Sequence, residues 1–150
     1  MELVLNSSPP HSRDFSRELG GVFSCNLPRQ IQYHVVWCVK YRRKVLIDDV
    51  EQSLKKELLA TAQSLGVRIS AMECMSDHIH LLLDCSPQHY IPTVVKILKG
   101  NSARHLFMLH PSVKEKLWDG HLWNPSYFVA TVSEQTSRQI EEYISRQKSR

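Results

Sequence analysis

Apolar side chains recur along the chain at two different spacings, which predicts strands alternating with helices. Residues 31–40 (IQYHVVWCVK) carry apolar residues at every second position, as a half-buried strand does. Residues 67–75 and 78–85 are also strand-like, and because only two residues separate them we expect an antiparallel hairpin. Residues 126–132 (SYFVATV) form a further β-rich run, which predicts a fourth strand.

Two longer segments show helical spacing instead. Between Asp48 and Gly66 apolar residues recur every three or four positions, with Asp48 or Asp49 as the expected cap and Gly66 as the expected stop. Residues 86–111 have a broad apolar helical face that ends just before Pro111. The sequence therefore predicts one helix after the first strand and one after the hairpin.

The C-terminal part of the chain predicts one more helix. Residues 111–117 indicate a short helical stretch, and Ser133 is a suitable cap for a helix over residues 134–147 (EQTSRQIEEYISRQ). The resulting order is β-α-β-β-α-β-α. This order is typical of an α+β fold with a ferredoxin-like or RRM-like antiparallel sheet and helices packed on one of its faces.

Length and composition fit a single intracellular domain. Residues 1–28 are rich in Ser, Pro, Gly and Arg without periodicity, so we expect a poorly ordered extension followed by one domain over residues 29–150. Hydrophobic residues make up 42% of the chain and no apolar run is long enough to span a membrane. The N-terminus also lacks the pattern of a secretory signal, which indicates a cytoplasmic protein.

The four cysteines are expected to be reduced thiols. They form no C-x-x-C pair, and three of them lie in strand-like segments, where a free thiol acts as a small apolar side chain. This favours packing over a zinc site.

The net charge of +4 is compatible with a polyanionic partner, and two basic segments are candidates for contacting one. In the first, cations surround the ring of Tyr41; in the second, they lie opposite the apolar stripe of the second helix. The candidates are Lys40, Arg42, Arg43, Lys44, Lys96, Lys99 and Arg104. A solvated surface is the alternative interpretation of both segments.

Two histidines open the strand over residues 78–85. Side chains alternate in a strand, so His78 and His80 share one face while Ile79 and Leu81 share the other. Because the apolar set suits the helix layer, we expect the histidines on the opposite side of the sheet. Two neutral imidazoles at this spacing can bind one divalent ion, or they can be hydrogen-bonded residues at a strand end.

The last predicted helix carries Tyr143 and Gln147 four residues apart, so both side chains lie on one helix face. Taken alone, this tyrosine would be a half-buried packing residue.

Taken together, these motifs resemble the single-tyrosine HUH transposases, specifically the TnpA-type transposases of the insertion-sequence 200/605 family. The similarity covers residues 31–148 and includes YHVVWCVKYRRKVL, MSDHIHLLL, LKGNSAR, LW and WNPSYFVATV as well as the H-U-H motif at His78–His80 and Y-x-x-x-Q at Tyr143–Gln147. The resemblance implies a homodimer that cleaves and rejoins hairpin-forming single-stranded DNA, in which the tyrosine helix can complete the partner's active site.

The resemblance also implies the roles of individual residues. His78, His80 and Gln147 would bind Mg²⁺ or Mn²⁺, and Tyr143 would be the nucleophile that forms a 5′-phosphotyrosine. Tyr127 is a rival nucleophile, but no glutamine follows it four residues later, so we interpret it as structural.

Three other functions remain open at this stage. One is a domesticated relative that processes chromosomal palindromes, and another is a non-catalytic module that binds single strands through aromatic and basic side chains. The third is a metal-dependent hydrolase that uses water as its nucleophile.

Overall fold

The computed structural model describes residues 30–117 and 119–147, so the expected extension over residues 1–28 lies outside the described part. The seven predicted elements are present in the predicted order, with a 3-10 turn after the first strand and the short helix before the last strand. In chain order they are β1 (Ile31–Cys38), η1 (Lys40–Arg42), α2 (Asp49–Ser64), β2 (Arg68–Cys74), β3 (His78–Cys85), α3 (Ile91–Leu109), α4 (Pro111–Glu115), β4 (Phe128–Val132) and α5 (Glu134–Gln147).

The four strands form one antiparallel sheet in the order β2-β3-β1-β4. The strand that follows α2 does not pair with β1; instead β3 lies between β1 and β2, as in a split βαβ arrangement. The predicted α+β fold is therefore confirmed. Within residues 30–117 and 119–147, no helix is both long and apolar enough to cross a membrane.

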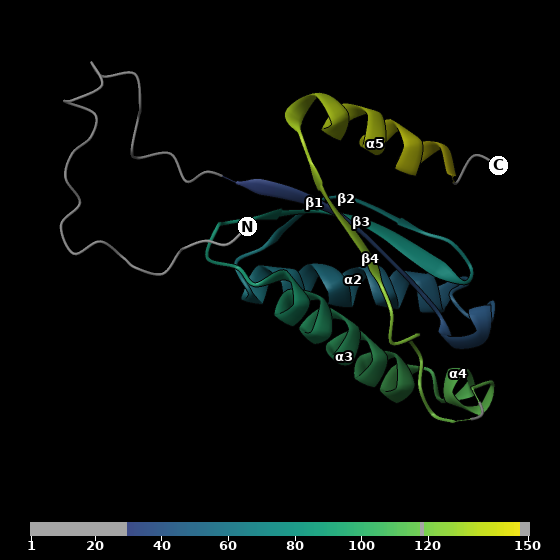
Figure 1. Cartoon of the computed structure of the whole chain (residues 1–150). Coiled ribbons are helices and arrows are strands. Elements are labelled where there is room, and N and C mark those ends of the chain that lie inside the picture. Colours follow the sequence, from purple (N-terminus) through teal and green to yellow (C-terminus); the bar gives the residue numbers. More distant parts are fainter. Residues whose placement is uncertain (1–29, 118, 148–150) are drawn as a thin grey trace, which may run out of the picture.

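One face of the sheet is packed by α2 and α3, as Figure 1 shows. The alternating apolar residues of β1 and β3 point to this side, where Trp37, Ile79 and Leu81 belong to the main hydrophobic core. The antiparallel register places Trp37 opposite Ile79 and Val35 opposite Leu81. The period-2 pattern of both strands is therefore explained by burial against the helix layer.

The opposite face is covered in part by α5, which Figure 1 shows on the other side of the sheet from α2 and α3. The sequence predicted helices on one face only, and this holds for α2 and α3. Within α5, Ile144 is only 1% exposed, and Leu82, which points to the same face of the sheet, is also fully buried. Neither belongs to the main core, so α5 rests on a small separate apolar contact.

The helix ends follow the sequence with one exception. Gly66 adopts φ 72° directly after α2, and Ser133 Oγ accepts a hydrogen bond from the Thr136 backbone N–H at 3.4 Å. Asp48, one of the two expected caps, occupies the N-cap position of α2, but its side chain makes no capping hydrogen bond. Its backbone adopts φ 51°, outside the extended conformation in which a cap side chain reaches the first free N–H groups.

Candidate active site

β3 places His78 and His80 on the face of the sheet that α5 covers. They are the first and third residues of this strand, and their rings lie 5.0 Å apart, centroid to centroid. Because β3 is hydrogen-bonded to a strand on each side, the pleat of the sheet fixes this separation. The predicted division of the strand between a histidine face and an apolar face is thus present in the structure.

The ring of His78 is oriented by the residue before it. Asp77 Oδ1 lies 2.6 Å from His78 Nδ1, while Asp77 Oδ2 accepts a hydrogen bond of 2.9 Å from Arg42 Nε. Burial raises the pKa of Asp77, but the hydrogen bonds from His78 and Arg42 outweigh it and lower the pKa overall. An ionised carboxylate only accepts hydrogen bonds, so His78 donates through Nδ1 and its Nε2 keeps a free lone pair.

The ring of His80 has a different neighbour at the same atom. His34 Nε2, on β1, lies 3.3 Å from His80 Nδ1. Burial is the main reason that the pKa of His80 falls to about 4, with additional lowering from His78 and His34, and burial also lowers the pKa of His34. Both rings are therefore neutral at pH 7.

The helix α5 brings Tyr143 to these histidines. The rings of Tyr143 and His80 meet edge to face with centroids 6.1 Å apart, although 63 positions separate them in sequence. Tyr143 remains 51% exposed, whereas the neighbouring Ile144 is buried and anchors the helix. Gln147 ends α5 one turn later and is half-buried. The structure thus brings together the tyrosine and both histidines in one chain.

The residues present fit a divalent metal. Metal-binding histidines usually have one ring nitrogen held by a polar neighbour, and each of these imidazoles has such a neighbour at Nδ1. In the described ranges no group of three His, Cys, Asp or Glu side chains could hold a metal ion, so any third protein ligand would be of another type. The amide oxygen of Gln147 is such a donor.

Three of the predicted DNA-binding cations already have partners within the protein. Lys40 forms an ion pair with Asp119, and Arg42 binds Asp77 as described above. Lys99 is half-buried and donates to the carbonyl oxygens of Asn124 at 2.6 Å and Pro125 at 3.2 Å, while burial lowers its pKa. Lys99 therefore anchors the segment before β4 to α3.

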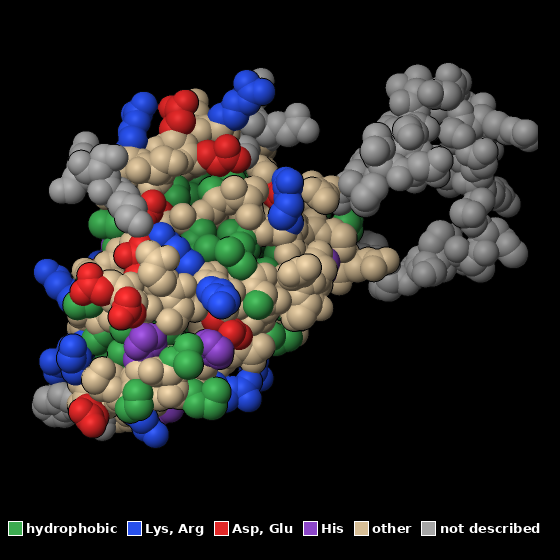
Figure 2. Space-filling model, turned by 180° about the vertical axis from the view of Figure 1, so that it is seen from behind, with side chains coloured by type: hydrophobic (Ala, Val, Ile, Leu, Met, Phe, Trp, Pro, Cys, Tyr) green, Lys and Arg blue, Asp and Glu red, His purple; other side chains and the backbone are tan. Residues whose placement is uncertain are grey.

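The other predicted cations are more accessible. Arg43, Lys44, Lys96 and Arg104 are exposed, with Arg104 also donating to Asn101 Oδ1 at 2.6 Å. Tyr41 is exposed next to Lys40 and adopts φ 58°, an uncommon conformation for a residue other than glycine. Figure 2 shows that basic and acidic side chains are interspersed on the face drawn there, so this face has no broad patch of one charge.

Tyr127 lies away from the histidines. It packs against the main core, and the ammonium of Lys99 lies 5.8 Å from the centre of its ring. This position on the helix side of the sheet is consistent with its interpretation as a structural residue.

Sequence reasoning missed Asp77, which contacts Nδ1 of His78, and His34, which contacts Nδ1 of His80. Asp77 was interpreted only as part of a turn, and His34 alternates with the core residues of β1 without any motif of its own. The position of Asp77 directly before the H-U-H motif was an available signal. The contact between His34 and His80 depends on the pairing of β1 with β3, which places His34 opposite Leu82 and diagonal to His80.

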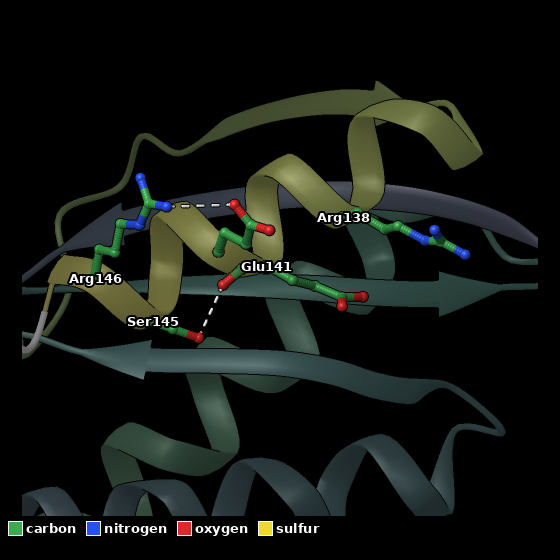
Figure 3. Close-up of a pocket in the computed structure, with 5 residues that line it drawn as sticks. Arg138, Glu141, Ser145 and Arg146 are labelled. Carbon is green, nitrogen blue, oxygen red and sulfur yellow. Dashed lines mark hydrogen bonds and ion pairs between the residues drawn. The ribbon is translucent and has the colours of Figure 1, made fainter.

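A separate cavity lies on the flank of α5 and does not include the candidate site. It measures about 580 Å³ and is lined by Arg138, Glu141, Glu142, Ser145 and Arg146. Figure 3 shows Arg138 and Arg146 at opposite ends of this segment, with Glu142 paired to Arg146 at 3.5 Å. Its two carboxylates balance its two guanidinium groups, so it has no net positive charge to attract a polyanion such as DNA.

Comparison with known proteins was made by sequence and by structure. A family model described as "Transposase IS200 like" matches residues 28–147. The chain is 52% identical over 118 residues to the ISDra2 transposase TnpA of Deinococcus radiodurans, covering 79% of this chain and 84% of the relative. It is 32% identical over 116 residues to the transposase for insertion sequence element IS200 of Salmonella typhimurium, covering 77% and 76%.

Two solved structures share the fold. A crystal structure assigned as a transposase of D. radiodurans R1 superposes with a TM-score of 0.69 at 46% identity, covering 83% of this chain and 96% of the other. A REP-associated tyrosine transposase bound to a REP hairpin has a TM-score of 0.59 at 13% identity, covering 81% and 69%, and supports the fold alone. On the family match and the two sequence relatives, this chain belongs to the IS200-like transposase family.

Proposed function

We propose that residues 29–150 form a single-tyrosine transposase that cleaves and rejoins single-stranded DNA at the ends of a mobile element. The observation that carries this proposal is the meeting of the Tyr143 ring with His80, beside His78, on the face of the sheet that α5 covers in part. Membership of the transposase family supports a DNA-processing activity. The protein would act where its DNA is, in the cytoplasm.

In the proposed reaction the Tyr143 oxygen attacks the scissile phosphorus. A bond forms between phosphorus and this oxygen, the bond from phosphorus to the 3′ oxygen breaks, and the products are a 5′-phosphotyrosine and a free 3′-OH. Phenols ionise only near pH 10, so the phenol proton must leave as the new bond forms, and the departing 3′ oxygen must take up one proton to become the 3′-OH. Because one phosphodiester replaces another, the step can reverse onto a new 3′-OH without ATP.

The residues around Tyr143 have distinct proposed tasks. Asp77 orients the ring of His78, the sheet places His80 beside it, and Ile144 holds the tyrosine helix against the sheet. A divalent metal such as Mg²⁺ or Mn²⁺, bound by His78, His80 and Gln147, would stabilise negative charge on the phosphate oxygens.

Replacing Tyr143 by Phe tests the proposed nucleophile. Labelled single-stranded DNA carrying an element end, incubated with Mn²⁺ and wild-type protein, should give a covalent adduct on a denaturing gel. Tyr143→Phe should give none, because no oxygen is left to attack. Tyr127→Phe is the matched control and should retain the adduct, since it removes the same hydroxyl from the other side of the sheet.

The same gel separates the alternatives. Cleaved DNA without attached protein would indicate hydrolysis by water, and binding without cleavage would indicate a non-catalytic module. Adduct formation by Tyr143→Phe would contradict the assignment of the nucleophile.

We also propose that the substrate ends form hairpins and that the protein acts as a homodimer. The REP-associated relative bound to a REP hairpin is consistent with hairpin recognition. The proposed DNA contacts are Lys40, Arg42, Arg43, Lys44, Lys96, Lys99 and Arg104. The exposed members would meet phosphates directly, including Arg42, which is also paired with Asp77. Lys40 and Lys99 would act through the loops that they hold.

In the structure Tyr143 lies beside His80 of its own chain, and exchange of α5 between two copies would create composite sites. Mixing Tyr143→Phe protein with His80→Gln protein tests this exchange. Composite sites would restore adduct formation in the heterodimer, because one site would combine an intact tyrosine with intact histidines. An inactive mixture, with subunit exchange verified by mass spectrometry, would establish that each chain uses its own tyrosine.

A further inference from the structure

His34 brings a ring nitrogen within hydrogen-bonding distance of His80. It lies on β1, half-buried, with Nε2 at 3.3 Å from His80 Nδ1. The two rings are within 12° of parallel and their centroids are 5.5 Å apart. The distance between the ring centres equals the distance between the two nitrogens plus roughly one ring radius for each ring. Both nitrogens therefore lie near the line that joins the ring centres.

The rings therefore meet edge to edge in nearly one plane and not face to face. That is the geometry of an N–H···N hydrogen bond, in which one nitrogen carries the proton and the other supplies the lone pair. Two tautomers of the pair satisfy it. If His34 donates, the remaining proton of neutral His80 sits on Nε2; if His80 donates through Nδ1, its Nε2 has a free lone pair.

Only the second tautomer makes His80 equivalent to His78. His78 donates through Nδ1 to Asp77, and a metal held between the two histidines requires both Nε2 lone pairs. The structure thus provides one acceptor for each ring from a different element: Asp77 from the loop before β3, and His34 from β1.

The His34 ring is itself held in place. Phe128 on β4 contacts it edge to face with centroids 6.1 Å apart, and the register sets Phe128 and His34 on the same face as His80. Its position is therefore determined by three neighbouring strands, β4, β1 and β3.

We propose that His34 is a positioning residue, whose Nε2 accepts the Nδ1 proton of His80 and so keeps His80 Nε2 free to bind the divalent metal of the proposed site. This inference rests on the proposed function for the identity of the metal site. His34 does not bind the metal or the DNA in this role.

Two variants of nearly equal size test the proposal in the full-length protein. His34→Gln retains a carbonyl oxygen that can accept from His80 Nδ1, whereas His34→Met fills similar space with only a weak acceptor. The first readout is the ring ¹⁵N spectrum of metal-free protein, which reports which nitrogen of His80 carries the proton. Wild type and His34→Gln should show Nδ1–H, and His34→Met should gain Nε2–H.

The second readout is Mn²⁺ affinity, measured by electron paramagnetic resonance of the free ion. Loss of a group that orients a ligating histidine typically weakens metal binding about 10- to 100-fold. We expect a loss of this size for His34→Met and recovery of most of it for His34→Gln. Far-ultraviolet circular dichroism and the urea midpoint verify that both variants are folded.

Unchanged ¹⁵N spectra and unchanged Mn²⁺ affinity in folded His34→Met would overturn the proposal, as would equal losses in both variants. Failure of the proposed function gives a different result. If Tyr143 forms no adduct in wild-type protein but His34→Met still changes the His80 tautomer and the Mn²⁺ affinity, the positioning role stands and the transposase mechanism does not.

Discussion

The two faces of the sheet differ in the side chains that they bury: one face is mainly apolar and the other carries several polar residues. On the side of α2 and α3, β1 and β3 present apolar residues that are almost completely buried, such as Trp37 and Leu81. On the side of α5 the same strands present His34, His80 and Asp84, all polar. Because successive side chains of a strand point to opposite faces, residues that stabilise the core alternate with residues of the candidate site.

Two buried polar residues on the α5 side have specific partners. His80 has His34, and the buried carboxylate of Asp84 accepts hydrogen bonds from Gln32 at 2.7 Å and from Arg68 Nε at 2.8 Å. An apolar core tolerates exchange between side chains of similar volume, whereas a buried polar group loses its partner when either member changes. The α5 side is therefore the more sensitive to the identity of each residue.

The largest expected difference between the two faces is in the stability lost when Leu81 or Leu82 is replaced by Ala. Leu81 and Leu82 are both fully buried, but only Leu81 belongs to the main core. We expect Leu81→Ala to lower the free energy of unfolding by about 4 kcal/mol and Leu82→Ala by about 2 kcal/mol, because α5 can settle into the smaller cavity. Urea denaturation measures both losses.

The loss of adduct formation, measured per folded protein, should rank the two variants in the opposite order. Leu82→Ala should reduce adduct formation more than Leu81→Ala, because Leu82 lies on the face that positions Tyr143. Equal stability losses with equal activity losses would contradict the separation of the two faces.

Acidification should destabilise the α5 side through His80. The pKa of His80 falls from the ordinary 6.5 to about 4 in the folded protein. Between these two pH values the unfolded chain binds a proton at His80 and the folded protein does not, so folding stability is unaffected above pH 6.5 and is lost as the pH falls from 6.5 to 4. The expected loss is about 3 kcal/mol by pH 4. Urea midpoints of the wild type and of His80→Gln, measured across this range, should converge as the pH falls; parallel curves would contradict the assignment.

The smallest expected effect concerns the outer surface of the helix layer. Lys96 on α3 is exposed, and if it contacts a hairpin phosphate, Lys96→Gln should reduce the slope of log affinity against log salt by about 0.9. Lys56→Gln on α2 makes the same change in charge at another exposed position and should leave the slope unchanged. Equal slopes for Lys96→Gln and the wild type would show that the layer of α2 and α3 contributes only stability.

The fold was largely predictable because its signals are local and repeated. The apolar residues of β1, β3, α2 and α3 each recur at the period of their element, and burial on one side of the sheet enforces that period. The N-cap position at Asp48 was predicted, but the absence of its capping hydrogen bond was not, because residue type alone does not specify the backbone conformation, here φ 51°. That α5 covers the other face also escaped prediction, since α5 has only one fully buried apolar side chain, Ile144, among its described residues.

The candidate site was predictable in its motifs but not in its surroundings. His78, His80, Tyr143 and Gln147 could be named from spacing and from resemblance to a family. The contact of His34 with His80 needs the register between β1 and β3, and the pairing of Arg42 with Asp77 needs the path of the loop after β1. Both contacts join residues at least 35 positions apart, which periodicity does not report.

The central position of β3 makes the length of this strand more constrained than its composition. Its pairing with β1 and β2 is fixed along both edges, so the insertion or deletion of one codon within residues 78–85 would turn every following side chain to the opposite face. An insertion after Ile79 would send His80 into the apolar core and turn Leu81 toward α5. Exchanges among Ile, Leu and Val at the apolar positions would leave both imidazoles where they are, so sequence drift in this strand should proceed by substitution and almost never by a change in residue number.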